Sequence, residues 1–186
     1  MPAETKPVAL VVTRRQMRPS FHDVFVQLFN EQFHRLYRYL DRLSGDPELA
    51  ADLAQEAFVR LYRRGSLPDS PPAWLITVAM NLFRNARSQA SRRLRLLTSA
   101  RAETLLADPP PSPAEVTDGD DSRRRVRAAI DRLPERDGRM LLLRAEGYSY
   151  RDIAAALELN AASVGTLLAR AKRAFRDLYE GGTDAP

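Results

Sequence analysis

Cysteine is absent from this 186-residue sequence, and histidine occurs only as His22 and His34. The absence of cysteine excludes disulfide bonds and thiolate metal sites, and two histidines are too few for a usual zinc ligand set. Long apolar runs are also missing, because the longest one near the start, residues 8–12, is too short for a signal peptide or a membrane span. We therefore expect a cytoplasmic protein with no metal, no cofactor and no membrane insertion.

Lysine is scarce as well, because Lys6 and Lys172 are the only lysines among 29 basic residues. The remaining basic residues are arginines, whose planar guanidinium groups suit contacts to phosphates and base edges. The formal net charge of +5 and the pI near 9.9 are modest evidence for a polyanionic partner, since basic charge also favours solubility. Charge alone does not decide the function.

Helical periodicity dominates the first half of the chain. Apolar residues recur every three or four positions over residues 21–43, which predicts an amphipathic helix. Asp46 followed by Pro47 is a typical helix start and Gly65 a typical helix end, so these residues delimit a second helix. A third helix is expected after the loop at residues 66–70, and the three helices should share one core.

The composition changes between residues 102 and 122, where the carboxylates have no basic neighbours. Four prolines within residues 109–113 exclude a helix there, so this segment is an acidic linker. Helical periodicity resumes on both sides of Pro134. We expect an all-α fold of two small helical domains joined by a flexible, proline-rich linker. The expected boundaries are an extension at 1–19, a first domain at 20–97, the linker at 98–124, a second domain at 125–180 and a tail at 181–186.

Residues 148–175 have the pattern of a helix-turn-helix, a motif that places its second helix in a DNA groove. Ser149 and Asp152 have the spacing of a capping box and predict the start of the first helix. Asn160 is an N-cap candidate for the second helix, in which apolar residues recur on one face from Val164 onward. An ordinary helical hairpin has similar caps and periodicity, so the local pattern leaves both interpretations open.

Three polar residues share one face of the second expected helix, because Asp52, Gln55 and Glu56 lie at positions i, i+3 and i+4. Paired carboxylates can act as acid and base, but no nucleophile, metal cluster or glycine-rich phosphate loop lies nearby. We therefore expect no catalytic residues and no enzymatic activity. The face is either solvated or a docking surface for a basic partner.

A second polar set lies on the third expected helix. Asn81 and Asn85 are one helical turn apart, and Arg84 and Arg87 occupy adjoining positions. Amides can read base edges, and guanidinium groups can hold phosphates. A polar helix flank with incidental asparagines fits the pattern about equally well, so both interpretations stay open.

Several of these segments together resemble the extracytoplasmic-function sigma factors of bacterial RNA polymerase. The resembling segments are DLAQEAF at 52–58, PAWL at 72–75 with Asn81 and Asn85, Leu133-Pro134, and YSYRDIA at 148–154. Their order and separation both match, over about residues 21–179. The resemblance implies two helical domains, called region 2 and region 4, joined by a flexible linker.

The resemblance also implies roles for the candidate residues. In region 2, the face of Asp52, Gln55 and Glu56 would pack on the clamp helices of the largest polymerase subunit. The third helix and the loop before it would capture a flipped base of the promoter minus-10 element, a step that promoter melting requires. The residues implied in minus-10 binding are Asn81, Arg84, Asn85, Arg87, Arg92 and Arg93. The residues implied in minus-35 binding by region 4 are Ser163, Thr166, Arg170, Lys172 and Arg173.

The sequence departs from the family pattern at four positions. Glu158 stands in the helix-turn-helix turn where relatives usually have glycine, which predicts a strained or reshaped turn. Gly165 and Leu167 replace a lysine and an arginine that are usual in the recognition helix, so little remains at its N-terminal end to read bases. Asn85 stands where many relatives have aspartate, which removes one repulsion from DNA phosphates.

The sequence thus predicts a sigma factor that binds core RNA polymerase and directs promoter recognition, melting and initiation at a restricted promoter set. An anti-sigma factor is a further partner that the resemblance allows. The main alternative is a stand-alone helix-turn-helix regulator whose N-terminal helical domain binds a signal or a protein; a helical scaffold without nucleic-acid function is the third. A sigma factor binds polymerase first, whereas a regulator binds its operator without polymerase.

Overall fold

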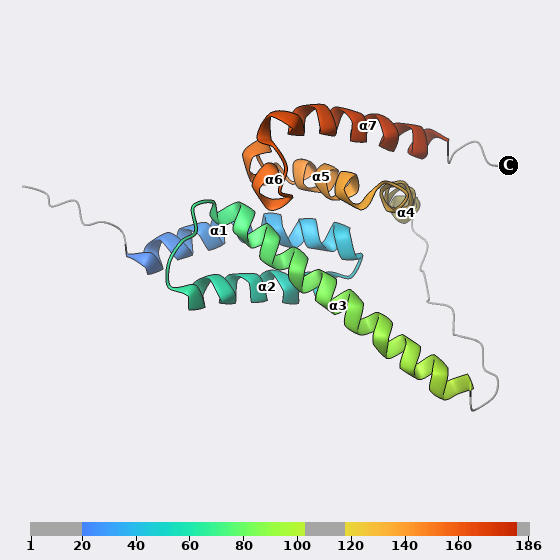
Figure 1. The fold of residues 1–186 in the computed structure, drawn as a ribbon, viewed down its shortest axis with the longest axis horizontal. Helices are drawn as coiled ribbons and strands as arrows, with labels where there is room; N and C mark the ends of the chain where they lie inside the picture. Colours follow the sequence, from blue (N-terminus) through green and yellow to red (C-terminus); the bar gives the residue numbers. More distant parts are fainter. Residues whose placement is uncertain (1–19, 103–117, 182–186) are drawn as a thin grey trace, which may run out of the picture.

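The computed structural model of the chain describes residues 20–102 and 118–181 (Figure 1). Within these ranges all regular structure is helical, and no strand occurs. The elements are α1 (Phe21–Ser44), α2 (Pro47–Arg64), α3 (Pro71–Ala102), α4 (Asp118–Asp131), α5 (Glu135–Ala145), α6 (Tyr150–Ala156), the single 3-10 turn η1 (Ala161–Ser163) and α7 (Val164–Glu180). The prediction of an all-α fold is therefore confirmed.

The predicted ends of the first two helices match the structure because each end has suitable local chemistry. The Asp46 carboxylate caps α2 by accepting hydrogen bonds from the backbone N–H groups of Glu48 and Leu49, both at 3.0 Å. Gly45 and Gly65 follow α1 and α2 with φ of 71° and 70°, the left-handed conformation that glycine adopts without penalty. The short connection between α1 and α2 places α2 antiparallel along α1, and α3 crosses both helices (Figure 1).

A continuous buried core extends from α1 to α7. It is built from the apolar stripes that the periodicity predicted, and it includes side chains of both predicted domains. Its largest fully buried aliphatic members are Leu36, Leu40, Leu61, Leu75, Ile76, Met140, Leu143, Ile153 and Val164. The two predicted domains are therefore packed together in this structure.

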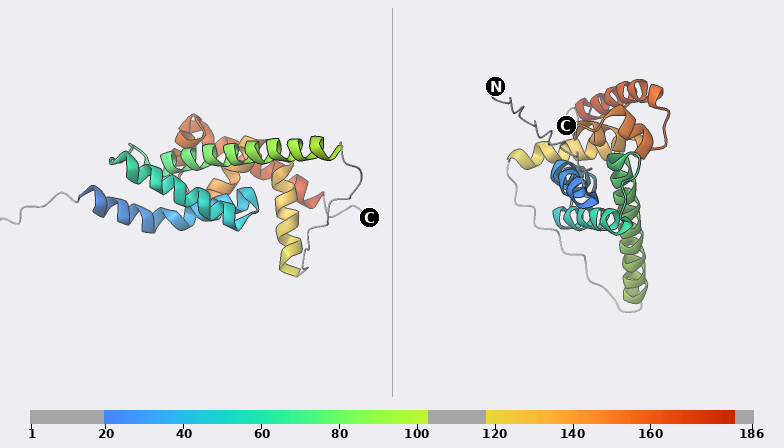
Figure 2. Two further views of the ribbon diagram at one scale, coloured as in Figure 1. Left: turned by 90° about the horizontal axis from the view of Figure 1, so that it is seen from below. Right: turned by 90° about the vertical axis from the view of Figure 1, so that its left-hand side faces the viewer.

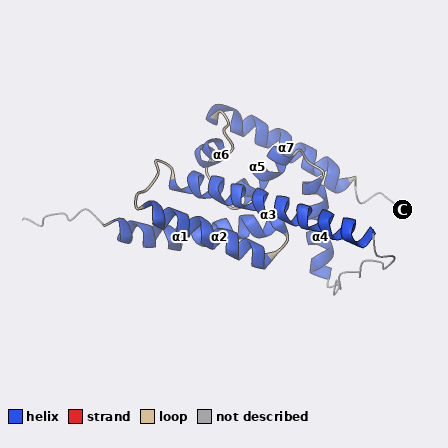
Figure 3. Cartoon of the chain, turned by 60° about the horizontal axis from the view of Figure 1, so that its bottom comes forward, coloured by secondary structure: helices blue, strands red, loops and turns tan. Residues whose placement is uncertain are grey.

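The packing between domains uses two helix pairs. α6 lies against α3, and α5 lies against α1. The side views show α5, α6 and α7 along one side of the first three helices, whereas the last turns of α3 project beyond them (Figures 2 and 3). The sequence predicted two domains and a linker but did not predict this docking.

Helical structure reaches further toward the predicted linker than expected. α3 ends at Ala102 and α4 begins at Asp118, and both residues fall inside the span 98–124. The prolines at 109–113 lie outside the described residues, as do the extension at 1–19 and residues 182–186 of the tail.

The turn of the helix-turn-helix is strained at the position that the sequence singled out. Glu158 has φ of 55° and is the one residue other than glycine with positive φ in the described parts of the chain. Left-handed backbone costs a residue with a Cβ about 1–2 kcal/mol. We expect Glu158→Gly to raise the free energy of unfolding by about 1 kcal/mol, because relief of this strain outweighs the extra conformational entropy that glycine loses on folding. Denaturant titration of the full chain measures this.

Glu158→Ala is the matched control for that prediction. It removes the same carboxylate but keeps the Cβ, so we expect no comparable gain in the free energy of unfolding. Equal stabilisation by both substitutions would contradict the assignment of strain to the backbone of Glu158.

Candidate nucleic-acid interface

The helix-turn-helix begins with the caps that the sequence predicted. The Ser149 hydroxyl accepts a hydrogen bond from the Asp152 backbone N–H at 3.1 Å, and the Asp152 carboxylate accepts one from the Ser149 N–H at 3.3 Å. The Asn160 side-chain oxygen Oδ1 accepts a hydrogen bond from the Ala162 N–H at 3.0 Å. The second helix therefore starts with the 3-10 turn η1 and becomes α-helical at Val164.

The interior of the motif is closed by small and branched side chains. Ile153 and Val164 are fully buried, and Ala154 is 5% exposed. A Cβ placed on Gly165 would lie 3.5 Å from the Tyr150 ring, which is an ordinary van der Waals distance. Packing therefore does not require glycine at the position where relatives usually carry lysine.

The candidate minus-35 residues lie on the exposed side of η1 and α7. Val164, Leu168 and Ala171 point into the domain, which leaves the opposite side of the helix in solvent. All five candidates are exposed: Ser163, Thr166, Arg170, Lys172 and Arg173. Two short hydroxyl side chains at the beginning and three cations further along favour phosphate contacts over base reading.

The candidate minus-10 residues lie on α3. Its apolar side, with Leu75, Ile76 and Met80, is buried in the core and orients the polar side outward. The Asn81 side-chain oxygen accepts a hydrogen bond from Arg84 Nη1 at 2.9 Å, so these two groups form one polar unit. All six candidates are exposed: Asn81, Arg84, Asn85, Arg87, Arg92 and Arg93.

The loop before α3 is tied to the helix-turn-helix. Ser70 is half-buried, and its hydroxyl donates a hydrogen bond to the Asp152 carboxylate at 3.3 Å. Asp152 also closes the capping box of α6, so the same carboxylate serves both domains.

The third candidate set lies on α2. Asp52 and Gln55 are exposed, and Glu56 is half-buried and paired with Arg60, its Oε1 2.8 Å from the arginine Nε. Leu53, Ala54 and other apolar neighbours turn into the core, so the three polar side chains share one outward face. The structure thus brings two of the predicted sets together on one helix each and the minus-35 set on η1 and α7, and the sets occupy three separate surfaces.

A polar cluster lies between the domains and was not predicted from the sequence. It consists of Arg35, Arg38 and Arg42 on α1 together with Glu146 and Tyr148 in the turn after α5. The arginine spacing of three and four residues was a signal that these side chains share a face. Burial raises the pKa of the Tyr148 phenol well above its ordinary value, so the ring stays neutral.

Neither a metal site nor a membrane-spanning helix is found in the described parts of the chain. Among residues 20–102 and 118–181, no group of three or more histidine, aspartate or glutamate side chains is arranged to hold a metal ion. None of the helices in these same parts of the chain is long and apolar enough to cross a lipid bilayer.

Comparison with protein families matches both halves of the fold. Residues 28–93 match the model for sigma-70 region 2, and residues 123–175 match the model for sigma-70 region 4. The first range covers α2 and most of α1 and α3, and the second covers the helix-turn-helix. All three candidate surfaces described above therefore lie in domains with sigma-factor architecture.

Individual relatives agree with this architecture. The chain is 34% identical over 140 residues to the sigma factor EcfG of Rhodopseudomonas palustris, an alignment that covers 71% of this chain and 70% of EcfG. It is 31% identical to CarQ of Myxococcus xanthus, over 89% of this chain and 92% of CarQ. It is also 31% identical to SigE of Mycolicibacterium smegmatis, where it spans 60% of the SigE length. The chain belongs to the extracytoplasmic-function sigma factors.

A solved structure shows the same fold. The sigma factor RpoE of Bartonella quintana, crystallised in complex with the anti-sigma factor NepR, superposes with a TM-score of 0.57 at 22% identity. The match covers 84% of this chain and 97% of the RpoE chain. At this identity the likeness supports the fold alone.

Proposed function

We propose that this chain binds core RNA polymerase and directs it to a restricted set of promoters, where it supports DNA melting and the start of transcription. The observation that carries the proposal is the presence of regions 2 and 4 in one chain, with an acidic and amide face on α2 separate from an amide and arginine face on α3. The chain itself is not an enzyme, because polymerase performs nucleotidyl transfer. It acts in the cytoplasm, where polymerase is located.

The face of Asp52, Gln55 and Glu56 is the proposed docking surface for polymerase. Its side chains point outward and include the two carboxylates of Asp52 and Glu56, which a basic partner surface would complement. It lies on α2, away from the amide and arginine face of α3, so docking on polymerase would leave the DNA-facing helix accessible.

The face of α3 is the proposed minus-10 surface. Asn81 and Asn85 would contact the bases of the melted non-template strand, and the arginines would hold its phosphates. Asn81 is already oriented by Arg84, so the amide would meet the base with little loss of side-chain entropy. The exposed end of α3, with Arg92 and Arg93, extends the basic surface along the strand.

Region 4 is the proposed anchor at the minus-35 element. Ser163 and Thr166 are too short for bidentate base contacts, whereas Arg170, Lys172 and Arg173 suit the DNA backbone. Contacts to the backbone position a protein without reading the sequence. Promoter choice would therefore depend mainly on region 2. We include an anti-sigma factor among the expected partners, since the B. quintana neighbour was solved with one.

The order of binding tests the proposed function. We expect the free chain to bind core polymerase tightly and to bind duplex promoter DNA weakly in a mobility-shift titration at fixed salt, because DNA affinity depends steeply on salt. The holoenzyme should then bind the promoter. A specific footprint made by the free chain without polymerase would instead indicate a stand-alone regulator, and binding of neither would indicate a scaffold.

A further inference from the structure

A buried carboxylate joins region 4 to region 2. Glu146 lies between α5 and α6, and its side chain is 2% exposed. Its Oε2 is 2.7 Å from the Nε of Arg38, and its Oε1 is 2.7 Å from the Nη1 of Arg42. Arg35 donates from Nε to the Glu146 carbonyl oxygen at 3.1 Å and places its guanidinium carbon 4.4 Å from the centre of the Tyr148 ring. One turn of region 4 is therefore held by three arginines of α1.

Further polar contacts surround this cluster. Arg127 of α4 donates hydrogen bonds to the carbonyl oxygens of Arg42 and Leu43 at 3.3 and 3.2 Å, where α1 ends. A cation is favoured at that position because unpaired carbonyl groups accumulate at a helix C-terminus. Ser70 and Asp152 add the hydrogen bond between the α3 loop and α6. Each of these hydrogen bonds joins a donor in one domain to an acceptor in the other, so together they fix how the two domains dock.

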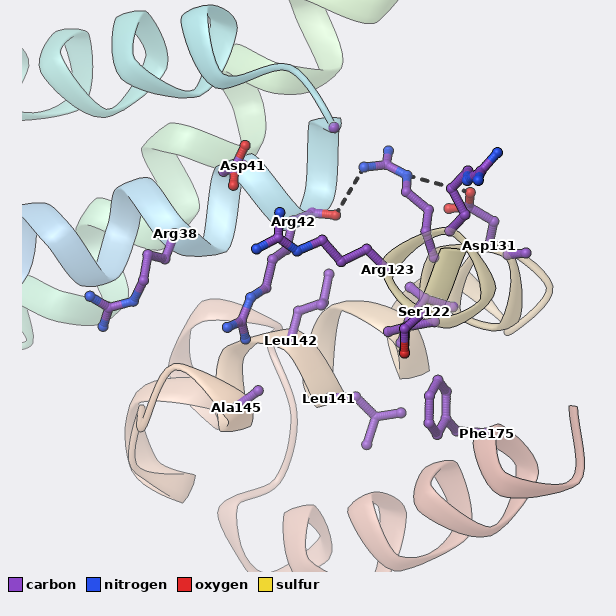
Figure 4. Close-up of a pocket in the computed structure, with 16 residues that line it drawn as sticks. Arg38, Asp41, Arg42, Ser122, Arg123, Asp131, Leu141, Leu142, Ala145 and Phe175 are labelled. Atoms are coloured by element: carbon purple, nitrogen blue, oxygen red, sulfur yellow. Dashed lines mark hydrogen bonds and ion pairs between the residues drawn. The ribbon is translucent and has the colours of Figure 1, made fainter. Parts of the chain in front are cut away.

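Some buried polar atoms at this interface lack hydrogen-bond partners, as expected of an interface that separates. The Tyr39 hydroxyl, the Arg139 Nε and the Glu146 Oε1 are buried there without a hydrogen-bond partner, although Glu146 Oε1 is ion-paired with Arg42. Such groups favour separation, because water would satisfy them once the domains part. Two clefts of about 1070 and 940 Å³ also flank the contact, the first between α1 and α4, α5 and α7 (Figure 4). Interfaces between domains of one chain commonly have this transient character.

The docked arrangement conflicts with promoter binding. The minus-10 and minus-35 promoter elements are named for positions about 25 base pairs apart. On B-form DNA this separation is about 85 Å, at roughly 3.4 Å per base pair. A compact chain of this size has a radius of gyration of only about 16 Å. In addition, Arg84 and Arg87 of the minus-10 surface line the second cleft together with Glu135 of α5, so a region 4 carboxylate faces the approach to these arginines. Both DNA surfaces can be used at once only after the domains separate.

We propose that Glu146, held by Arg35, Arg38 and Arg42, is an interdomain latch that keeps the free chain closed and that opens when the chain joins polymerase. The closed state then suppresses premature promoter binding without any additional protein. The suppression of promoter binding rests on the proposed sigma-factor activity. The closed state held by Glu146 concerns the free chain and does not depend on that activity.

The latch can be tested by distance measurement on the full chain, which has no native cysteine to interfere. Glu48→Cys on α2 and Asp177→Cys on α7 are both at exposed positions and accept a donor and an acceptor dye. In this background, Glu146→Gln keeps the side-chain shape but leaves the arginines without a counter-charge. We expect the open-to-closed ratio from single-molecule energy transfer to rise about tenfold, since breaking one partner of a buried charge pair loosens an interface at least this much.

Two further variants make the outcome decisive. Glu180→Gln removes an exposed carboxylate of α7 and should leave the ratio unchanged. The pair Arg38→Ala and Arg42→Ala removes the latch from the other side, at side chains that are 50% and 49% exposed, and should open the chain even if Glu146→Gln unfolds region 4. Helicity by circular dichroism identifies unfolding. An unchanged ratio in the folded latch variants would overturn the proposal.

Binding of a single-stranded minus-10 oligonucleotide separates the latch from the proposed function. If the variants open and also bind the oligonucleotide more tightly than the unmodified chain, both ideas are supported. If they open without any gain in oligonucleotide binding or in transcription with polymerase, the latch stands and the proposed function of the α3 surface fails.

Discussion

Replacing Asn81 with alanine is expected to reduce open-complex formation about tenfold while leaving affinity for core polymerase unchanged. Asn81 is exposed on α3 and held by Arg84, where it would contact the captured base only after melting. A good amide contact to a base edge is worth about 1–3 kcal/mol, and 1.4 kcal/mol corresponds to tenfold. Permanganate reactivity of the melted promoter measures the first quantity, and a binding titration with core polymerase measures the second.

The control for Asn81→Ala is Asn30→Ala, which removes an exposed amide from α1 in the same domain. It should change neither quantity. Equal losses of polymerase binding and of open complex in Asn81→Ala would show that the substitution acts on docking or on folding, and would contradict the assignment of Asn81 to the melted strand.

Reversing two charges on α2 is expected to act on binding to core polymerase, the quantity that Asn81→Ala should leave unchanged. Asp52→Lys combined with Glu56→Lys should weaken binding to core polymerase by about tenfold or more, because like charges brought together at an interface cost several kcal/mol. Glu56 also loses its pair with Arg60, but this pair is about half exposed and adds little to stability. Competition against a labelled unmodified chain for core polymerase gives the change in affinity.

Asp177→Lys combined with Glu180→Lys provides the matched control, since it reverses the same number of exposed carboxylates on α7. The net charge of the two double variants is identical, so a difference between them reports position rather than overall charge. Equal affinity of the α2 double variant and the unmodified chain for polymerase would remove the docking role from this face.

Local structure was predictable because the signals that start and stop these helices act over a few residues. Ser149 with Asp152, Asp46, Asn160 and the glycine stops all make the contacts that their spacing predicts. The strain at Glu158 was also predictable, since a residue with a Cβ stands where the turn requires positive φ. The ends of α3 and α4 were less predictable, because helix ends near a linker depend on weak local preferences.

The docking of the two domains was not predictable from local patterns. Arg38 and Glu146 are 108 positions apart, and no spacing rule connects them. A lone glutamate in a turn is ordinarily solvated, so Glu146 carried no signal by itself. The regular spacing of Arg35, Arg38 and Arg42 did indicate one basic face on α1, but it did not indicate the partner.

The sequence predicted which candidate residues share a surface, but it did not predict what each surface binds. Periodicity showed that Asn81 and Asn85 share one side of a helix, and the structure confirms that they are exposed there together. A polar flank and a base-reading surface have the same periodicity, so only the resemblance to a family favoured one of them. The exposed and sparse surface of η1 and α7 is in line with the expectation that region 4 anchors more than it reads.

In vitro transcription with core polymerase over a promoter library, with and without this chain, tests the central claim most directly. We expect the chain to enable initiation at a small subset of promoters that share a minus-10 motif and vary more widely at the minus-35 element. Transcription that does not depend on the chain, together with a footprint that the chain makes on duplex DNA in the absence of polymerase, would contradict it.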